Sequence, residues 1–160
     1  MTIFTTGGTI DKTYFDAKST YQVDDPQILA ILDEANVTAT YRQETLFRKD
    51  SLELTDADRA EIARRVQTDE HARILITHGT DTMVQTAQAI QAAGAPGKTV
   101  VLVGSLTPAR FKASDAAFNV GFALGALQVL PPGVYVTMNG QIFRPDEVRK
   151  DRDRNQFVAL

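Results

Sequence analysis

Two short segments combine threonine hydroxyls with glycine at the points where an apolar run gives way to polar residues. The first reads TTGGT at residues 5–9, and the second reads HGTDTM at residues 78–83. In an open α/β sheet, ligands bind in the crevice beyond the carboxyl ends of the strands, which is where both segments are expected. A threonine hydroxyl becomes a nucleophile beside a base, and glycine N–H groups stabilise an oxyanion. Together the segments predict hydroxyl chemistry at one shared site.

Taken singly, each segment has a simpler structural interpretation. Two glycines after a strand favour an ordinary turn, and Asp81 with Thr82 favours the N-terminal cap of the helix that follows. His78 ends an apolar run and is predicted to be a structural, hydrogen-bonded histidine. The dinucleotide pattern Gly-x-Gly-x-x-Gly and the complete phosphate-loop pattern Gly-x-x-x-x-Gly-Lys-Ser/Thr are absent, so neither kind of site is expected.

Length and composition limit the other possibilities. The 160 residues favour one domain spanning residues 1–160, and the formal net charge of −3 gives no general attraction to nucleic acid. Without cysteine and with only two histidines, neither a metal site nor another cofactor is expected. No apolar run approaches the roughly 18 residues of a membrane span. The first residues lack the basic and apolar stretches of a signal peptide, so we expect a cytoplasmic protein.

Apolar periodicity predicts strands that alternate with helices. Residues 24–26 resemble an acidic cap followed by proline, opening a helix that runs to about residue 35, whereas residues 9–23 predict a long loop or loose hairpin. A charged tail is expected over residues 144–154. Further strands are expected at residues 2–6, 37–46, 73–77, 99–103 and 133–138, and further helices at residues 55–68, 82–93 and 114–127. This alternation predicts a doubly wound α/β domain with a mostly parallel sheet flanked by helices.

The two segments also carry a family resemblance. TGGTID at residues 6–11 and HGTDTM at residues 78–83 resemble the two signature motifs of the bacterial-type L-asparaginase/glutaminase family. Members of that family hydrolyse a side-chain amide through a threonine acyl-enzyme, so the resemblance implies an L-asparaginase folded like the family's N-terminal domain. The preference between asparagine and glutamine stays open, because one methylene changes binding only modestly. Further matching segments lie at residues 103–108, 114–119, 136–140 and 148–150.

The resemblance implies roles for individual residues. Thr9 matches the nucleophile, and Thr80, Asp81 and Lys150 match a threonine–aspartate–lysine relay that forms the second catalytic set. Ser51 matches the serine that receives the substrate α-carboxylate, and Asp81 matches the residue that holds the α-ammonium group. Taken alone, Lys150 lies in a charged run and Ser51 resembles a turn residue. The aligned pattern is therefore what singles these two out.

Five further positions complete the expected site. Gly8 matches a glycine whose N–H can meet an oxyanion, and Ser105 falls where a backbone carbonyl meets the leaving amide. The catalytic tyrosine of the family has two candidates here: Tyr14 belongs to the compact pattern of short-chain members, and Tyr21 fits the long-chain spacing better. Leu52 stands where the family has a polar side chain, which implies altered recognition of the substrate α-carboxylate and α-amine.

Family members are usually longer, with a C-terminal domain that contributes an acidic residue to a neighbouring subunit. This sequence resembles short-chain members that match only the N-terminal domain, and a homodimer or homotetramer is expected. Two alternatives to an L-asparaginase remain. One is a glutaminase or a subunit of a tRNA-dependent amidotransferase, and the other is a non-catalytic module that binds asparagine or aspartate. The presence of Thr9, Thr80, Asp81 and Lys150 favours an enzyme.

Overall fold

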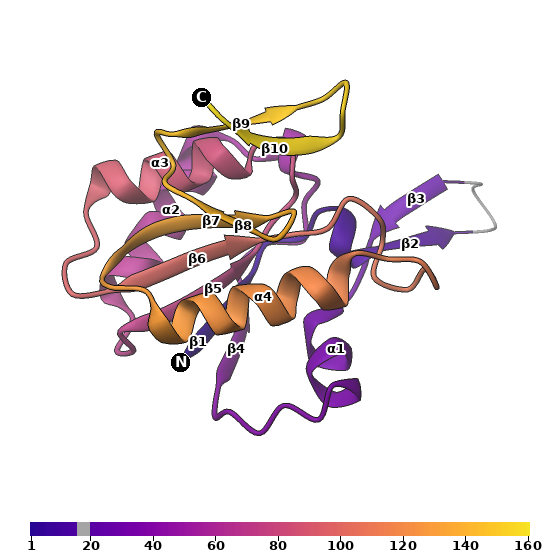
Figure 1. Ribbon diagram of the computed structural model, residues 1–160, viewed down its shortest axis with the longest axis horizontal. Helices are drawn as coiled ribbons and strands as arrows, with labels where there is room; N and C mark the ends of the chain where they lie inside the picture. The colour runs from indigo at the N-terminus through magenta and orange to yellow at the C-terminus, as the bar shows by residue number, and fades with distance from the viewer. Residues whose placement is uncertain (16–19) are drawn as a thin grey trace.

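The computed structural model describes residues 1–15 and 20–160, and their centre is a six-stranded sheet (Figure 1). Its strands are β1 (Thr2–Thr5), β4 (Arg42–Thr45), β5 (Arg73–Thr77), β6 (Thr99–Val103), β7 (Gly133–Met138) and β8 (Gln141–Phe143). They lie in the order β4-β1-β5-β6-β7-β8, and all pairs are parallel except β7 with β8. The carboxyl ends of five strands therefore meet at one edge of the sheet.

Helices cover both faces of this sheet. α1 (Ile28–Glu34) and α4 (Ala116–Val129) pack on one face, and α2 (Asp56–Thr68) and α3 (Met83–Ala93) pack on the other. The chain leaves β1 for β4 and then returns to β5 on the opposite side of β1, so the strand order reverses between β1 and β5. The predicted doubly wound α/β fold is confirmed, and ligand sites of such folds lie at this reversal.

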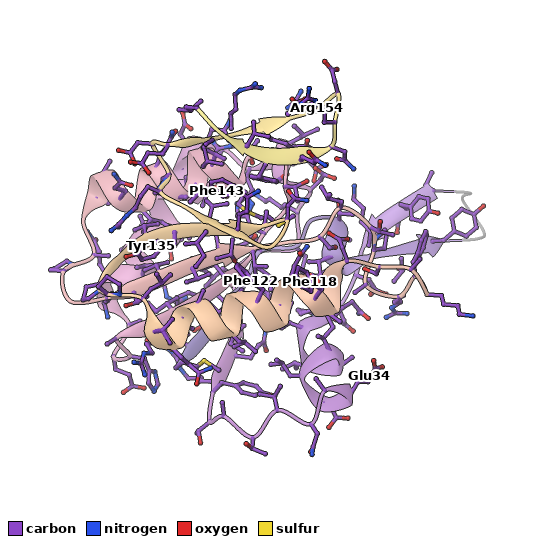
Figure 2. All side chains as sticks on the ribbon, viewed as in Figure 1. Glu34, Phe118, Phe122, Tyr135, Phe143 and Arg154 are labelled. Carbon is purple, nitrogen blue, oxygen red and sulfur yellow. The ribbon has the colours of Figure 1, made fainter. Side chains whose placement is uncertain are left out.

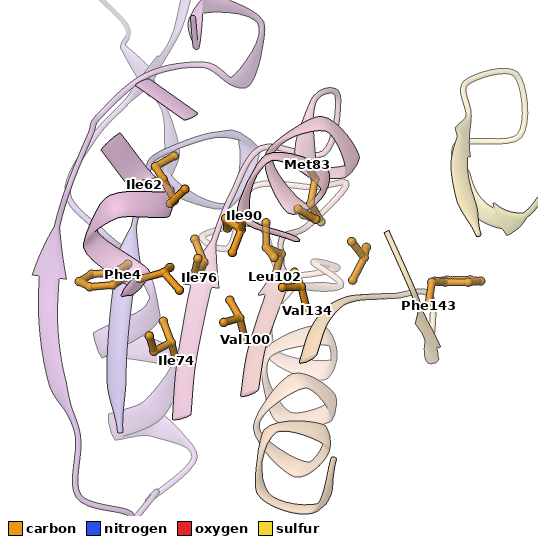
Figure 3. Packing of buried hydrophobic residues seen from close by; sticks show 14 of the residues in the cluster. Phe4, Ile62, Ile74, Ile76, Met83, Ile90, Val100, Leu102, Val134 and Phe143 are labelled. Carbon is orange, nitrogen blue, oxygen red and sulfur yellow. The ribbon is translucent and has the colours of Figure 1, made fainter. Parts of the chain in front are cut away.

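Alternate residues of the central strands enter two separate cores. In β5, Ile74 and Ile76 pack against α2 and α3, whereas Leu75 packs against α1 and α4. Figure 3 shows the first core, where Phe4 of β1 and Ile62 of α2 lie beside these isoleucines. All five side chains are fully buried. Because both faces are covered, the strands read as continuous apolar runs, and the sheet forms a rigid base for the loops at its edge.

Several element boundaries differ from the sequence predictions. β5, β6 and β7 occupy their predicted ranges, but β4 covers only four residues of the predicted strand at residues 37–46, because its partner β1 has only four residues to pair with. β7 is not the last strand. The charged tail contains β9 (Val148–Asp151), which pairs antiparallel with β10 (Gln156–Ala159). This hairpin was not predicted because each of its strands has one buried apolar residue, Val148 or Phe157, and the run of charged residues at 149–154 separates the two.

The segment after the first threonine motif forms a short helix and a hairpin. η1 (Thr9–Asp11) leads into β2 (Lys12–Phe15), which pairs antiparallel with β3 (Thr20–Val23) and projects away from the sheet (Figure 1). Of the two forms predicted for residues 9–23, the hairpin is the one found in β2 and β3, and residues 16–19 of that segment lie outside the described part of the chain. A second 3-10 turn, η3 (Ser51–Glu53), precedes α2. None of the helices in the described ranges is long and apolar enough to cross a membrane.

Candidate active site

Two glycines bring the threonine motifs together at the reversal of strand order. A Cβ atom added to Gly8 would lie 2.3 Å from Cα and 2.4 Å from N of Gly79, so the two backbones touch where a side chain would otherwise stand. Gly8 also has a φ of 95°, a conformation that favours glycine. Thr9 and Thr80 each follow one of these glycines. The contact therefore holds the backbones of the two predicted catalytic threonines beside each other, as the hypothesis of one shared site requires.

The amine of Lys150 connects Thr80 with Asp81. Its Nζ donates to Oγ1 of Thr80 at 2.8 Å and to Oδ1 of Asp81 at 2.9 Å. Lys150 lies on β9, and its side chain is only 13% exposed, whereas that of Asp81 is 34% exposed. Lys150 is therefore not the solvated surface residue that the charged run suggests. An amine in contact with a hydroxyl and a carboxylate can move a proton between them when it is neutral.

The side chains of Asp81 and Thr82 bond outside the helix that they precede. Thr82 is the N-cap residue of α3 but makes no side-chain capping bond. Its hydroxyl donates instead to the carbonyl of Ser51 at 2.7 Å. The interpretation of these residues as a helix cap is therefore wrong. Ser51 is 2% exposed and packs on Gly79, where an added Cβ would lie 2.6 Å from its Oγ. The predicted carboxylate-binding serine thus lies against the second threonine motif.

A third loop, after β6, closes on the same place. A Cβ added to Gly104 would lie 2.3 Å from the carbonyl oxygen of His78. Ser105 follows it, is 1% exposed, and donates its hydroxyl to the carbonyl of Thr107 at 2.6 Å. Asp115 accepts the N–H of Thr107 at 3.0 Å. The loop that carries Ser105 is therefore fixed by bonds of its own side chains as well as by its contact with the second motif.

His78 has the structural role expected from the sequence. It is completely buried, with Nδ1 2.7 Å from the carbonyl of Gly79 and Nε2 2.8 Å from the hydroxyl of Thr86. A carbonyl only accepts, so Nδ1 carries the proton and Nε2 accepts from the hydroxyl. Burial lowers the pKa of His78 to about 4, although the bond to Gly79 acts in the opposite direction. The neutral ring therefore fixes the turn that precedes Thr80.

Asp11 is a buried carboxylate that was not singled out from the sequence. Its Oδ1 accepts the N–H of Gln27 at 2.8 Å, so Asp11 supplies the cap of α1 that was expected from residues 24–26. Its Oδ2 is buried and has no partner within the described residues. Burial raises the pKa of Asp11 to about 6, against the lowering effect of the Gln27 N–H. Because Asp11 is the last residue of the TGGTID segment and ends the turn that begins at Thr9, the available signal was its place within that segment.

The two tyrosine candidates face each other across the projecting hairpin. Tyr14 of β2 is paired with Tyr21 of β3, and their ring centroids lie 5.4 Å apart. Both side chains are about half exposed. The ring of Tyr21 also lies 6.0 Å from that of Phe111, in the loop before α4. The hairpin therefore carries both candidates as one aromatic pair, with Tyr21 between two other rings.

A pocket of about 340 Å³ opens beside Asp81 and Lys150. Its other lining residues are Leu52, Arg152 and Asn155, of which Arg152 was not singled out from the sequence. Nε of Arg152 lies 4.0 Å from Oδ1 of Asp81. Nowhere in residues 1–15 and 20–160 do three or more His, Cys, Asp or Glu side chains gather in a way that would hold a metal ion. The pocket is therefore a polar opening next to the threonine–aspartate–lysine contact.

Comparison with known proteins gives matches over nearly the whole chain. The family model described as "Asparaginase, N-terminal" matches residues 1–157. The chain is 31% identical to a glutaminase-asparaginase of Pseudomonas aeruginosa over 174 residues, which cover 99% of this chain and 45% of that protein. It is also similar to the structure of the thermostable L-asparaginase of Thermococcus kodakarensis, with a TM-score of 0.82 and 27% identity over 99% of this chain and 50% of that one.

A shorter match points to a different assembly. The chain is 42% identical to a glutamyl-tRNA(Gln) amidotransferase subunit of Methanococcus vannielii over 69 residues, which cover 43% of this chain and 16% of that subunit. The chain spans about half the length, or less, of the curated relatives that it matches. The matches over nearly the whole chain, in contrast, extend across both threonine motifs.

Proposed function

Because this chain belongs to the asparaginase family, whose N-terminal model matches residues 1–157, we propose that it hydrolyses L-asparagine to L-aspartate and ammonia. The contact of Lys150 with both Thr80 and Asp81 carries the proposal, at 2.8 Å and 2.9 Å. It supplies a proton path next to the Gly8–Gly79 contact, where Thr9 lies. The relatives named glutaminase-asparaginase and L-asparaginase support the reaction class, amide hydrolysis.

In the first half of the proposed reaction, Thr9 forms an ester with the substrate. Its Oγ attacks the side-chain amide carbon and loses its proton to a neighbouring base, for which Tyr14 and Tyr21 are the candidates. The N–H groups near Gly8 stabilise the oxyanion that develops on the carbonyl oxygen. The C–N bond then breaks, and the nitrogen takes up a proton and leaves as ammonia. In this scheme the carbonyl of Ser105 orients the leaving amide.

In the second half, water releases the product. A water molecule attacks the ester carbon while the Thr80 hydroxyl, backed by Lys150 and Asp81, accepts its proton and passes it on. The C–O bond to Thr9 breaks, the proton returns to the Thr9 oxygen, and aspartate leaves. Ser51 holds the α-carboxylate during both halves, and Asp81 is the acceptor for the α-ammonium group.

The test is ammonia release from L-asparagine and L-glutamine by the wild type and by Thr9→Ala. We expect the variant to lose at least about 10²-fold in kcat, since no other hydroxyl takes over the ester. Thr38→Ala removes an exposed threonine of the loop before β4 and serves as the matched control with full activity. Hydrolysis by Thr9→Ala at the wild-type rate would reject the mechanism.

Two other functions give different results in the same assay. The match to an amidotransferase subunit favours a glutamine-hydrolysing subunit as the second candidate, and a higher kcat/KM for glutamine than for asparagine would support it. A non-catalytic binding module would release no ammonia from either amino acid. It would instead show a Tm that rises with the concentration of asparagine or aspartate.

The proposal includes a homodimer or homotetramer, and the cytoplasmic location stays a prediction from the sequence. The outward side of α4 supports self-association: Phe118 is 62% exposed and Val129 is 79% exposed. Figure 2 shows Phe118 next to Phe122 on this helix, and their rings stack with centroids 6.2 Å apart. Exposed apolar surface of this kind favours association. Light scattering tests the proposal, and a fully active monomer would contradict it.

A further inference from the structure

The pocket beside Asp81 carries more positive than negative charge. Of its lining residues, Asp81 is the carboxylate, whereas Lys150 and Arg152 are cations. Oδ1 of Asp81 already lies 2.9 Å from Nζ of Lys150 and 4.0 Å from Nε of Arg152. The other two lining residues, Leu52 and Asn155, are uncharged. Oδ1 of Asp81 therefore already faces two cations before any ligand arrives, and the lining as a whole carries more positive than negative charge.

This charge balance distinguishes between two kinds of asparagine. A free amino acid would bring its α-ammonium group to Asp81 and so place it beside Lys150 and Arg152. Like charges repel, and the repulsion from Lys150, whose side chain is 13% exposed, is screened less by water than that from Arg152, whose side chain is 69% exposed. An acylated α-nitrogen is an uncharged amide and avoids that repulsion, while the α-carboxylate of the same ligand is attracted by both cations. The pocket thus matches a monoanion better than a zwitterion.

Leu52 provides an apolar surface for the added acyl group. Its side chain is 64% exposed, although it directly follows the buried Ser51. Leu52 lines the Asp81 pocket and also a second pocket, of about 470 Å³, towards the β2–β3 hairpin. The charges around the second pocket are balanced, because two basic residues stand with two acidic ones and Lys12 pairs with Asp50 at 2.6 Å. An uncharged acyl group that extends over Leu52 into the second pocket therefore meets no net charge in that pocket.

We propose that the preferred substrate is an L-asparagine whose α-nitrogen is acylated, as in an N-acyl-L-asparagine or the C-terminal asparagine of a peptide. The inference rests on the proposed amide hydrolysis and names the substrate class of the same site. The reaction breaks the C–N bond of the side-chain amide, adds one water, and yields ammonia and the N-acyl-L-aspartate. The bond between the acyl group and the α-nitrogen stays intact, so no acetate is released from an N-acetyl substrate.

The first experiment compares ammonia release from N-acetyl-L-asparagine and from L-asparagine, with the full chain at fixed ionic strength. We expect kcat/KM for the N-acetyl compound to exceed that for the free amino acid, and Thr9→Ala to abolish both reactions. An equal or lower value for the N-acetyl compound, with free asparagine hydrolysed, overturns this inference alone. Absence of ammonia from both compounds rejects the proposed function as well.

The second experiment changes the charge at the pocket. Arg152→Gln lowers the positive charge beside Asp81, so the ratio of the two kcat/KM values should shift towards free asparagine by roughly two- to fivefold, chiefly through KM. Arg154→Gln is the matched control, because Arg154 lies in the same hairpin but does not line the pocket. Its ratio should equal that of the wild type. Equal ratios for Arg152→Gln and Arg154→Gln, with both variants folded by circular dichroism, contradict the charge argument.

The third experiment changes the apolar surface. Leu52→Gln gives the pocket a polar side chain that can bond an ammonium group, so the ratio should again shift towards free asparagine. Leu29→Gln, at an exposed leucine on α1, controls for the same change elsewhere and should leave the ratio unaltered. If Leu52→Gln leaves the ratio at the wild-type value, or moves it towards the N-acetyl compound, the proposed place of the acyl group is wrong.

Discussion

Gly8 and Gly79 touch through their backbones, and a Cβ on Gly8 would lie 2.3 Å from Cα of Gly79. The two residues follow different strands, β1 and β5, between which the strand order reverses. The geometry of the candidate site therefore depends on how closely two loops approach, before any side chain is considered. This makes the distance between Thr9 and Thr80 sensitive to a single added methyl group.

Gly79→Ala should disrupt the site with little loss of fold. The new methyl would lie 2.6 Å from Cβ and Oγ of Ser51, so the loop that carries Gly79 and Thr80 must move away from Ser51. A displacement of about 1 Å costs on the order of 10²-fold in rate, and we expect kcat/KM to fall by at least that factor. Ammonia-release kinetics measure it. Gly97→Ala is the control: it meets open space but has a φ of 72°, so it should cost about 1 kcal/mol of stability and leave kcat/KM unchanged.

Lys150→Met should slow the reaction without weakening substrate binding to a similar degree. The methionine keeps most of the length of the side chain but removes the amine that contacts Thr80 and Asp81. General acid–base groups contribute roughly 10²–10⁴-fold, so kcat should fall within that range while KM changes much less. Lys112→Met, at an exposed lysine before α4, should behave as the wild type. A wild-type kcat for Lys150→Met would show that the lysine is not part of the proton path.

Much of the scaffold was predictable because its strands are buried on both faces. β5, β6 and β7 are apolar apart from their ends and Thr137, and such runs between helical segments indicate a parallel sheet. The order of elements then places the ends of β1 and β5 side by side. The convergence of the two threonine motifs was predictable for the same reason, since adjacent parallel strands end at one edge.

The parts of the fold and of the candidate site that the sequence did not predict depend on contacts between residues far apart in the sequence. Lys150 reaches Thr80 only because β9 and β10 form a hairpin, and neither strand shows an apolar alternation long enough to reveal it. Asp11 caps α1 from the first loop, whereas the local sequence offers acids at residues 24 and 25 for the same bond. In both cases a tertiary contact replaces the partner that local sequence suggests. Local periodicity therefore gives no signal for either contact, and Lys150 could be singled out only by the family resemblance.

Tyr14→Phe should lower kcat more than Tyr21→Phe. The ring of Tyr21 packs between those of Tyr14 and Phe111, so its main contribution is to hold the hairpin, and phenylalanine preserves that packing. Tyr14 has one aromatic neighbour in this group and the shorter path to Thr9 along the sequence. We expect at least about a tenfold loss of kcat for Tyr14→Phe, in the range of a lost proton acceptor. Full turnover by both variants would show that neither hydroxyl takes part.

Asp11 and His78 are both buried, and acid changes their contributions to stability in opposite directions. Burial raises the pKa of Asp11 to about 6 from 3.8, so its stabilising contribution is present below pH 3.8 and is lost as the pH rises through 6. Burial lowers the pKa of His78 to about 4 from 6.5, so its contribution is present above pH 6.5 and is lost as the pH falls through 4. Each amounts to about 3 kcal/mol in full, so between pH 4 and 6 they largely cancel.

Replacing either Asp11 or His78 should reveal the effect of the other residue on how stability depends on pH. Asp11→Asn keeps an oxygen for the Gln27 N–H but no longer titrates, so its Tm should fall more steeply than that of the wild type between pH 6.5 and 4.5, where His78 then acts alone. His78→Gln should show the reverse, because Asp11 takes up its proton over that range and stabilises the fold. Thermal unfolding at a series of pH values measures both slopes, with Asp33→Asn on α1 as a control for the removal of a surface carboxylate. Parallel curves for all four proteins would mean that neither buried group titrates with the shift assigned to it.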